Sequence, residues 1–118
     1  MRIELPTHDG LLAFRLAGAE RSLSVGDTIE IGPGLVVTYD GSMVFRSVGI
    51  PEVVMFMLGI PANVVATVAA NQIWTWLQTR AAQKPLKVIV EGQEVPFEEE
   101  AVKRLLVERM EADNDNKV

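Results

Sequence analysis

Few residues of this sequence could carry out catalysis. His8 is the only histidine among the 118 residues, and Asp9 follows it. One histidine cannot build a multi-histidine metal site, and a His-Asp pair inside the turn-forming segment PTHDG is typical of a turn. The absence of cysteine excludes disulfides, thiolate nucleophiles and zinc–thiolate sites. The serines do not stand in a nucleophile-elbow pattern; they are Ser22, Ser24, Ser42 and Ser47. We therefore predict no catalytic residue.

Carboxylates gather near the C-terminal end. Glu98, Glu99 and Glu100 could supply paired carboxylates, but the favourable position of negative charge in the first turn of a helix explains them fully. The acidic stretch 108–115 lacks the glycine and the ligand spacing of a calcium loop. Neither GPG at 32–34 nor EGQE at 91–94 matches a phosphate loop. We expect no metal, no cofactor and no enzymatic activity.

The charge balance bears on the kind of partner. The formal net charge is −5, which argues against nucleic acid, since a phosphate-binding surface needs clustered basic residues. The one basic cluster, Arg80 with Lys84 and Lys87, is too small to form such a surface. Near the N-terminus, Glu4 and Asp9 interrupt any apolar signal segment. A protein partner and a cytoplasmic location are expected.

The elements that would position these groups begin with a β-rich segment, residues 1–49. Apolar residues alternate in RIEL (2–5) and in LLAFRL (11–16), as in half-buried strands. Gly-Pro-Gly at 32–34 is a breaker, and Asp40-Gly41 predicts a type I′ hairpin turn. That hairpin would pair Tyr39 with Ser42, Val37 with Val44 and Val36 with Phe45.

A second hairpin is predicted over residues 86–97, with Gly92-Gln93 as its two-residue loop. This register would pair Glu91 with Glu94, Val90 with Val95 and Val88 with Phe97, and Pro96 indicates an edge strand. Residues 98–112 predict an amphipathic helix, and 113–118 a disordered tail. The buried stripe of that helix would consist of Ala101, Val102, Leu105, Leu106 and Met110.

The central segment carries no charge from residue 53 to residue 79. Its length reaches the threshold for a transmembrane helix, so residues 53–77 could be embedded in the inner membrane. Pro61 argues instead for a helix that starts near it, preceded by a shorter helix over EVVMFML (52–58). On the second helix a polar stripe lies opposite an apolar one, as in a half-buried helix of a soluble domain. The polar stripe consists of Thr67, Asn71, Thr75 and Gln78.

Small residues recur at helical spacing in this segment, and two tryptophans follow them. Such a stripe allows two helix backbones to approach closely, so we expect self-association through it. An exposed tryptophan would add a contact surface, and packing of both rings in the core is the alternative. The predicted interaction surface consists of Gly59, Ala62, Ala66, Ala69, Ala70, Trp74 and Trp76.

The order of elements over residues 52–110 resembles that of the small constant-component modules that accompany variable effectors in bacterial conflict systems. The resemblance rests on PEVVMFMLGIPANVVATVAANQIWTWLQ followed by KVIVEGQEVPFEEEAVKRLLVERM. It implies a non-enzymatic adaptor that holds or signals to an effector protein. We therefore expect one α+β domain over residues 1–112, which consists of the β-rich segment (1–49) and a helix–hairpin–helix segment (52–112). Its expected function is that of a self-associating interaction module, with a membrane-inserted protein as the alternative.

Overall fold

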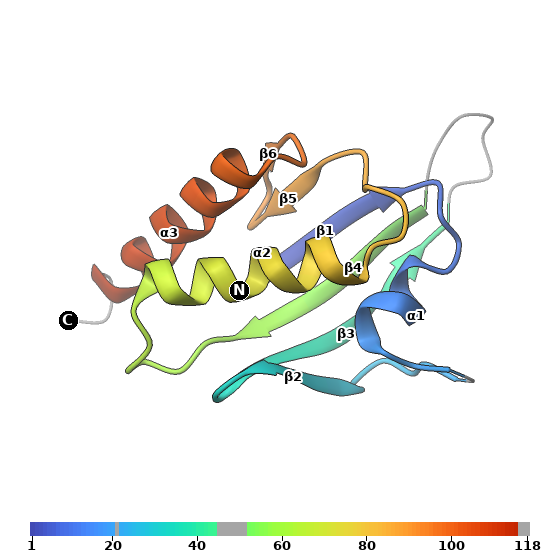
Figure 1. Cartoon of the computed structure of the whole chain (residues 1–118), viewed down its shortest axis with the longest axis horizontal. Helices are drawn as coiled ribbons and strands as arrows, with labels where there is room; N and C mark the ends of the chain where they lie inside the picture. Colours follow the sequence, from blue (N-terminus) through green and yellow to red (C-terminus); the bar gives the residue numbers. More distant parts are fainter. Residues whose placement is uncertain (21, 45–51, 116–118) are drawn as a thin grey trace.

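In the computed structural model of the chain, the described residues form six strands in one antiparallel sheet and three helices that pack on it (Figure 1). The structure describes residues 1–20, 22–44 and 52–115. The strands are β1 (Arg2–Thr7), β2 (Thr28–Gly32), β3 (Leu35–Met43), β4 (Glu52–Gly59), β5 (Val88–Val90) and β6 (Gln93–Val95). The helices are α1 (Leu12–Ala17), α2 (Ala66–Arg80) and α3 (Glu99–Asp115). The predicted α+β class is confirmed.

The strand order is β2-β3-β4-β1-β5-β6, so β1 lies inside the sheet between β4 and β5. All three helices cover the same face (Figure 1). Alternate residues of the strands point to this face and, with the inner sides of the helices, form one core. Its largest fully buried side chains include Ile3 and Leu5 of β1, Leu35 and Val37 of β3, Phe56 of β4, Ile73 and Leu77 of α2, and Leu106 of α3.

The predicted helix over residues 52–58 is wrong, because this segment is strand β4. It pairs along its length with β3 on one side and β1 on the other. Val54, Phe56 and Leu58 are buried on the helix-covered face, at a period of two. A continuous apolar run does not distinguish a buried strand from a buried helix, and here two flanking strands complete the ladder.

The predicted hairpin turn at Asp40-Gly41 is also wrong. Strand β3 continues through both residues, and a register shift between Tyr39 and Gly41 against β4 marks a bulge. Gly41 adopts a φ of 108°, which accounts for glycine at this position. Val37 pairs with Leu58 and with Ile29, not with Val44, and Phe45 lies outside the described residues. Tyr39 and Ser42 do meet, through hydroxyl groups 2.6 Å apart.

Gly-Pro-Gly at 32–34 does interrupt a strand pair, and the hairpin of this region lies there. Gly32 pairs with Leu35, which leaves Pro33 and Gly34 as the loop between β2 and β3. The predicted strand over residues 11–16 is helix α1, which buries Leu12, Ala13 and Leu16. Spacing of three and four residues, rather than two, decides the buried side in this short segment.

The second predicted hairpin exists as β5–β6, but its loop lies one residue earlier than predicted, so each pairing partner shifts by two residues. Its loop is Glu91-Gly92, with φ of 48° and 83°. Val90 therefore pairs with Gln93 and Val88 with Val95, and the predicted Glu91–Glu94 pair is absent. Strand β6 lies at the edge of the sheet, as Pro96 indicated.

Helix α2 starts at Ala66, five residues later than predicted, and ends at Arg80. Its polar stripe is exposed as expected. The alternative of a membrane-embedded helix over 53–77 is not formed, since these residues are divided among β4, a turn and α2. Within the described ranges, no helix is both long enough and apolar enough to cross a membrane.

Helix α3 buries Val102, Leu105, Leu106 and Met110 and continues to Asp115. The predicted disordered tail therefore begins too early at 113, and residues 116–118 lie outside the described ranges.

Candidate interaction surfaces

The seven residues of the predicted interaction surface occupy three different places. Ala69, Ala70, Trp74 and Trp76 are buried within the chain, with at most 6 % of each residue exposed. The small-residue side of α2 packs on the chain's own core, so these four residues present no surface to a partner. Gly59 lies on β4, whereas Ala62 and Ala66 line a pocket beyond the end of that strand.

The two tryptophans have different surroundings. The indole N–H of Trp76 donates to the carbonyl oxygen of Leu16 at 2.8 Å, and its ring meets Phe56 edge-on with centroids 5.3 Å apart. The ring of Trp74 lies against Phe97, with centroids 4.8 Å apart. The alternative that both rings belong to the core therefore describes them correctly.

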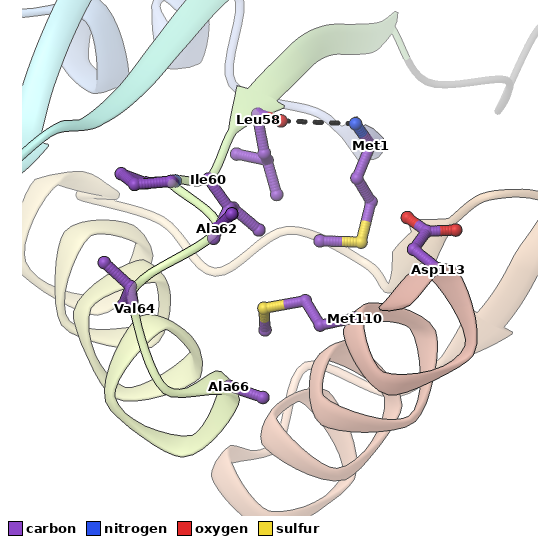
Figure 2. Close-up of a pocket in the computed structure, with 9 residues that line it drawn as sticks. Met1, Leu58, Ile60, Ala62, Val64, Ala66, Met110 and Asp113 are labelled. Carbon is purple, nitrogen blue, oxygen red and sulfur yellow. Dashed lines mark hydrogen bonds between the residues drawn. The ribbon is translucent and has the colours of Figure 1, made fainter. Parts of the chain in front are cut away.

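The pocket next to Ala62 and Ala66 has a volume of about 170 Å³ (Figure 2). Leu58, Ile60 and Val64 line one side, and Met110 of α3 lies opposite them. A volume of this size accommodates a single small apolar group. Asp113 is the one acidic or basic side chain among the described residues that line it.

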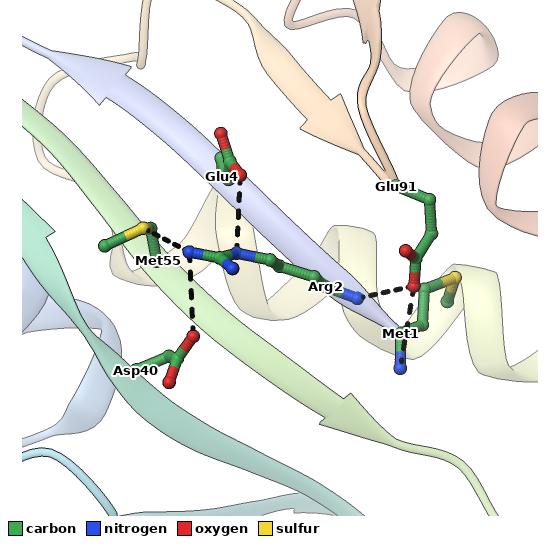
Figure 3. Close-up of polar contacts among 6 residues, drawn as sticks. All are labelled: Met1, Arg2, Glu4, Asp40, Met55 and Glu91. Carbon is green, nitrogen blue, oxygen red and sulfur yellow. Dashed lines mark hydrogen bonds and ion pairs between the residues drawn. The ribbon is translucent and has the colours of Figure 1, made fainter.

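The sheet has a second face that none of the described helices covers, and we call it the open face. Figure 3 views this side, with the helices behind the strands. Residues opposite each other in register share a face, so the pairing defines its members. They are Arg2, Glu4, Pro6, Thr28, Glu30, Val36, Thr38, Gly41, Met43, Val53, Met55, Met57, Gly59, Ile89 and Glu94.

An apolar stripe runs along the middle of the open face. It consists of Val36 and Met43 of β3 and of Val53, Met55 and Met57 of β4. Met57 is 39 % exposed and Met43 is 51 % exposed. Methionine is flexible and polarisable, and it is frequent at surfaces that contact other proteins. The sequence signal that could have found the stripe is the period of two in EVVMFMLG (52–59), once that segment is treated as a strand.

A charged cluster borders this stripe on β1. The Arg2 guanidinium lies 3.3 Å from a Glu4 carboxylate oxygen and 3.7 Å from one of Asp40 (Figure 3). Its Nη2 also lies 2.7 Å from the sulfur of Met55, a residue that is 8 % exposed. The backbone N–H of Arg2 donates to the Glu91 carboxylate at 2.9 Å. Arg2 thus has its counter-charges within the chain.

The side chains that the sequence offers for catalysis or metal binding do not gather at one site. His8 is exposed, and the Asp9 carboxylate accepts the backbone N–H of Leu11 at 3.0 Å and lies 3.3 Å from Arg15. Among the described residues, no three histidine, aspartate or glutamate side chains gather as metal ligands would. The Asp9 contacts are those of a turn, as its position in PTHDG indicated.

Comparison of the chain with known protein families, with curated proteins and with solved structures finds no match. Functional inference for this protein therefore depends on its surfaces.

Proposed function

We propose that this protein is a non-enzymatic interaction module that self-associates through its open face. The observation that carries the proposal is the apolar stripe of β3 and β4, left uncovered by every described helix. Along β4 the open face carries Val53, Met55, Met57 and Gly59, none of which is charged, and among the described residues only Met55 is contacted there by a charged group, the Arg2 guanidinium. Antiparallel sheets with one solvated face usually carry polar residues there. An apolar column on the central strand is better explained by a partner.

The proportions of the open face suit a protein interface. Neighbouring strands lie roughly 4.8 Å apart, which gives six strands a width of about 24 Å. The nine residues of β3 extend about 30 Å at roughly 3.4 Å each. The face therefore measures at most about 700 Å², close to the roughly 800 Å² that each partner buries in a standard interface.

The distribution of charge favours a second copy as the partner. Charged residues border the apolar stripe, with Glu30 on β2 at one side and Arg2 and Glu4 on β1 at the other. An apolar centre with a polar rim is the usual anatomy of an interface. Because Arg2 is already paired with Glu4 and Asp40, a two-fold contact would not bury it without a counter-charge.

The resemblance to effector-associated modules implies an effector protein as a further partner. We expect this module and the effector to meet in the cytoplasm. An adaptor role is compatible with self-association, since a dimer presents two copies of every remaining surface.

Sedimentation velocity of the wild-type protein and of two matched variants tests the proposal. Met57→Lys places a charge in the centre of the stripe, whereas Val68→Lys places the same charge on the exposed side of α2, where Val68 is 47 % exposed. We expect a dimer for the wild type and for Val68→Lys, and a monomer for Met57→Lys. A wild-type protein that stays monomeric at about 100 μM, well above the Kd of an ordinary dimer, contradicts self-association. Equal dimerisation of both variants contradicts the choice of surface.

A further inference from the structure

A second surface lies at the β2 edge of the sheet, between strand β2 and helix α2. Here the structure forms a groove of about 380 Å³. Ile31 of β2 lines one side, Asn71 and Thr75 of α2 line the other, and the fixed ring of Trp76 lies between them. Glu30 of β2, whose side chain belongs to the open face, also lines the groove. The groove shares no residue with the pocket of Figure 2.

Helix α2 follows β2 along the whole length of this groove. At one end, a methyl group on Gly32 would collide with the carboxamide of Gln72. At the other end, a methyl group on Gly18 would lie 2.6 Å from Arg80 Nη1 and 3.6 Å from Ile29 Cδ1. Gln72 therefore lies beside the end of β2, and Arg80 beside its beginning. The helix and the strand are two roughly parallel walls.

Strand β2 is the edge of the sheet among the described elements. The N–H of Tyr39 donates to the carbonyl of Asp27 at 2.8 Å, and the register places these two residues opposite each other. In an antiparallel ladder the residues alternate between facing the neighbouring strand and facing away from it. Thr28 and Glu30 therefore direct their backbone N–H and C=O groups outward, and both residues are exposed. These groups can form a ladder with one more strand.

A free cation stands at one end of the groove. Arg80 forms no ion pair with a carboxylate of the described residues. Guanidinium carries five N–H donors in a planar arrangement that suits a carboxylate. An incoming segment with an acidic side chain near the start of β2 would complete this contact.

We infer that the edge of β2 and the groove beside it bind an extended acidic peptide segment of a partner protein. The peptide adds a seventh strand to the sheet through Thr28 and Glu30, which is a recurrent mode of peptide recognition. Its alternate side chains enter the groove beside Asn71 and Thr75, and one carboxylate reaches Arg80. This site goes beyond the proposed self-association, because it uses the edge of the sheet rather than the open face.

A random ten-residue peptide library displayed on phage is the probe. We expect enriched sequences that share an Asp or Glu at one fixed position within a segment of alternating side chains. Arg80→Glu should lower the affinity of an enriched peptide by about tenfold, because it replaces attraction by repulsion at the carboxylate. Lys84→Glu makes the same charge change at an exposed residue outside the groove, and should leave the affinity within about twofold.

Two further measurements test the added strand itself. Thr28→Pro removes an outward N–H at the first residue of β2, a position where a strand tolerates proline, and should reduce binding while the thermal midpoint stays near that of the wild type. A second measurement needs no protein variant. N-methylation of every second peptide residue should abolish binding when the methylated groups face β2, and should preserve binding when they face away from it.

Three results would overturn the inference. The first is a selection that enriches no peptide, which would indicate that Glu30 and the nearby bulge only protect the edge from association. The second is binding that is insensitive both to Arg80→Glu and to N-methylation. The third is a dimer that Met57→Lys leaves intact and Thr28→Pro disrupts, since the β2 edge would then pair with a second copy.

Discussion

The indole N–H of Trp76 donates a buried hydrogen bond of 2.8 Å to the carbonyl oxygen of Leu16, a residue that lies 60 positions earlier in the chain. This bond joins the middle of α2 to the end of α1, and it holds the ring edge-on against Phe56. It fixes the aromatic wall of the groove between α2 and β2.

Replacement of Trp76 by Phe should leave the Leu16 carbonyl without its partner. A buried acceptor that loses its donor costs about 1–3 kcal/mol, so the free energy of unfolding in urea should fall by at least that amount. Trp74→Phe is the matched control, because the Trp74 indole nitrogen is buried and has no hydrogen-bond partner among the described residues. Equal destabilisation by the two variants would show that the hydrogen bond contributes nothing beyond the volume of the ring.

Phe56→Ala should be among the most damaging substitutions in the sheet. Phe56 is fully buried on the central strand and also contacts Tyr39, with ring centroids 5.5 Å apart. Removal of a buried phenyl ring costs about 3–5 kcal/mol, a large part of the 5–15 kcal/mol that stabilises an ordinary domain. Val68→Ala, on the exposed side of α2, should change stability by less than about 0.5 kcal/mol. Chemical denaturation followed by circular dichroism compares them, and a mild effect of Phe56→Ala would contradict a central position for β4.

Gly92→Ala and Gly10→Ala separate backbone conformation from steric space. A methyl group would meet no atom within 4 Å at either glycine, but Gly92 has a φ of 83° in the β5–β6 turn. Alanine costs about 1 kcal/mol or more in that left-handed region, so Gly92→Ala should lower the thermal midpoint. Gly10→Ala should leave the midpoint unchanged or raise it slightly. A neutral Gly92→Ala would contradict the left-handed backbone conformation of this residue in the turn.

Self-association through the open face should make thermal stability depend on protein concentration. Since a dimer is favoured by mass action, the unfolding midpoint of the wild type should rise as the concentration is increased about a hundredfold. Met57→Lys should show no such rise, and Val68→Lys should behave as the wild type does. Differential scanning calorimetry measures all three, and a midpoint that is independent of concentration in the wild type would exclude a dimer linked to folding.

Segments whose structure depends on residues close to them in the sequence were predicted correctly. Helix α3 has acidic residues in its first turn, an apolar stripe and the Glu99–Lys103 pair, which is observed at 3.2 Å. Each of these features acts within one or two helical turns. The exposed polar stripe of α2 follows from the same periodicity.

The candidate surfaces could not be predicted in this way. The sequence marked the small residues of α2 as an interface, but a small-residue stripe is equally suited to close packing inside one chain. Ala69 and Ala70 are buried by the chain itself. The open face depends on Met57 and Val36, which face the same side only because β4 pairs with β3.

By itself, the sequence determined the α+β class, the amphipathic character of α2 and α3, the presence of the β5–β6 hairpin and the lack of a recognisable catalytic motif. These properties follow from composition and from patterns a few residues long. Only the tertiary structure decided that residues 52–59 form a strand, that Asp40-Gly41 is a bulge within β3, and which apolar residues remain uncovered. The physical reason is that an apolar run can be buried equally well in a helical or in an extended conformation. Hydrogen bonds to strands β1 and β3, which lie elsewhere in the sequence, select the extended conformation for residues 52–59.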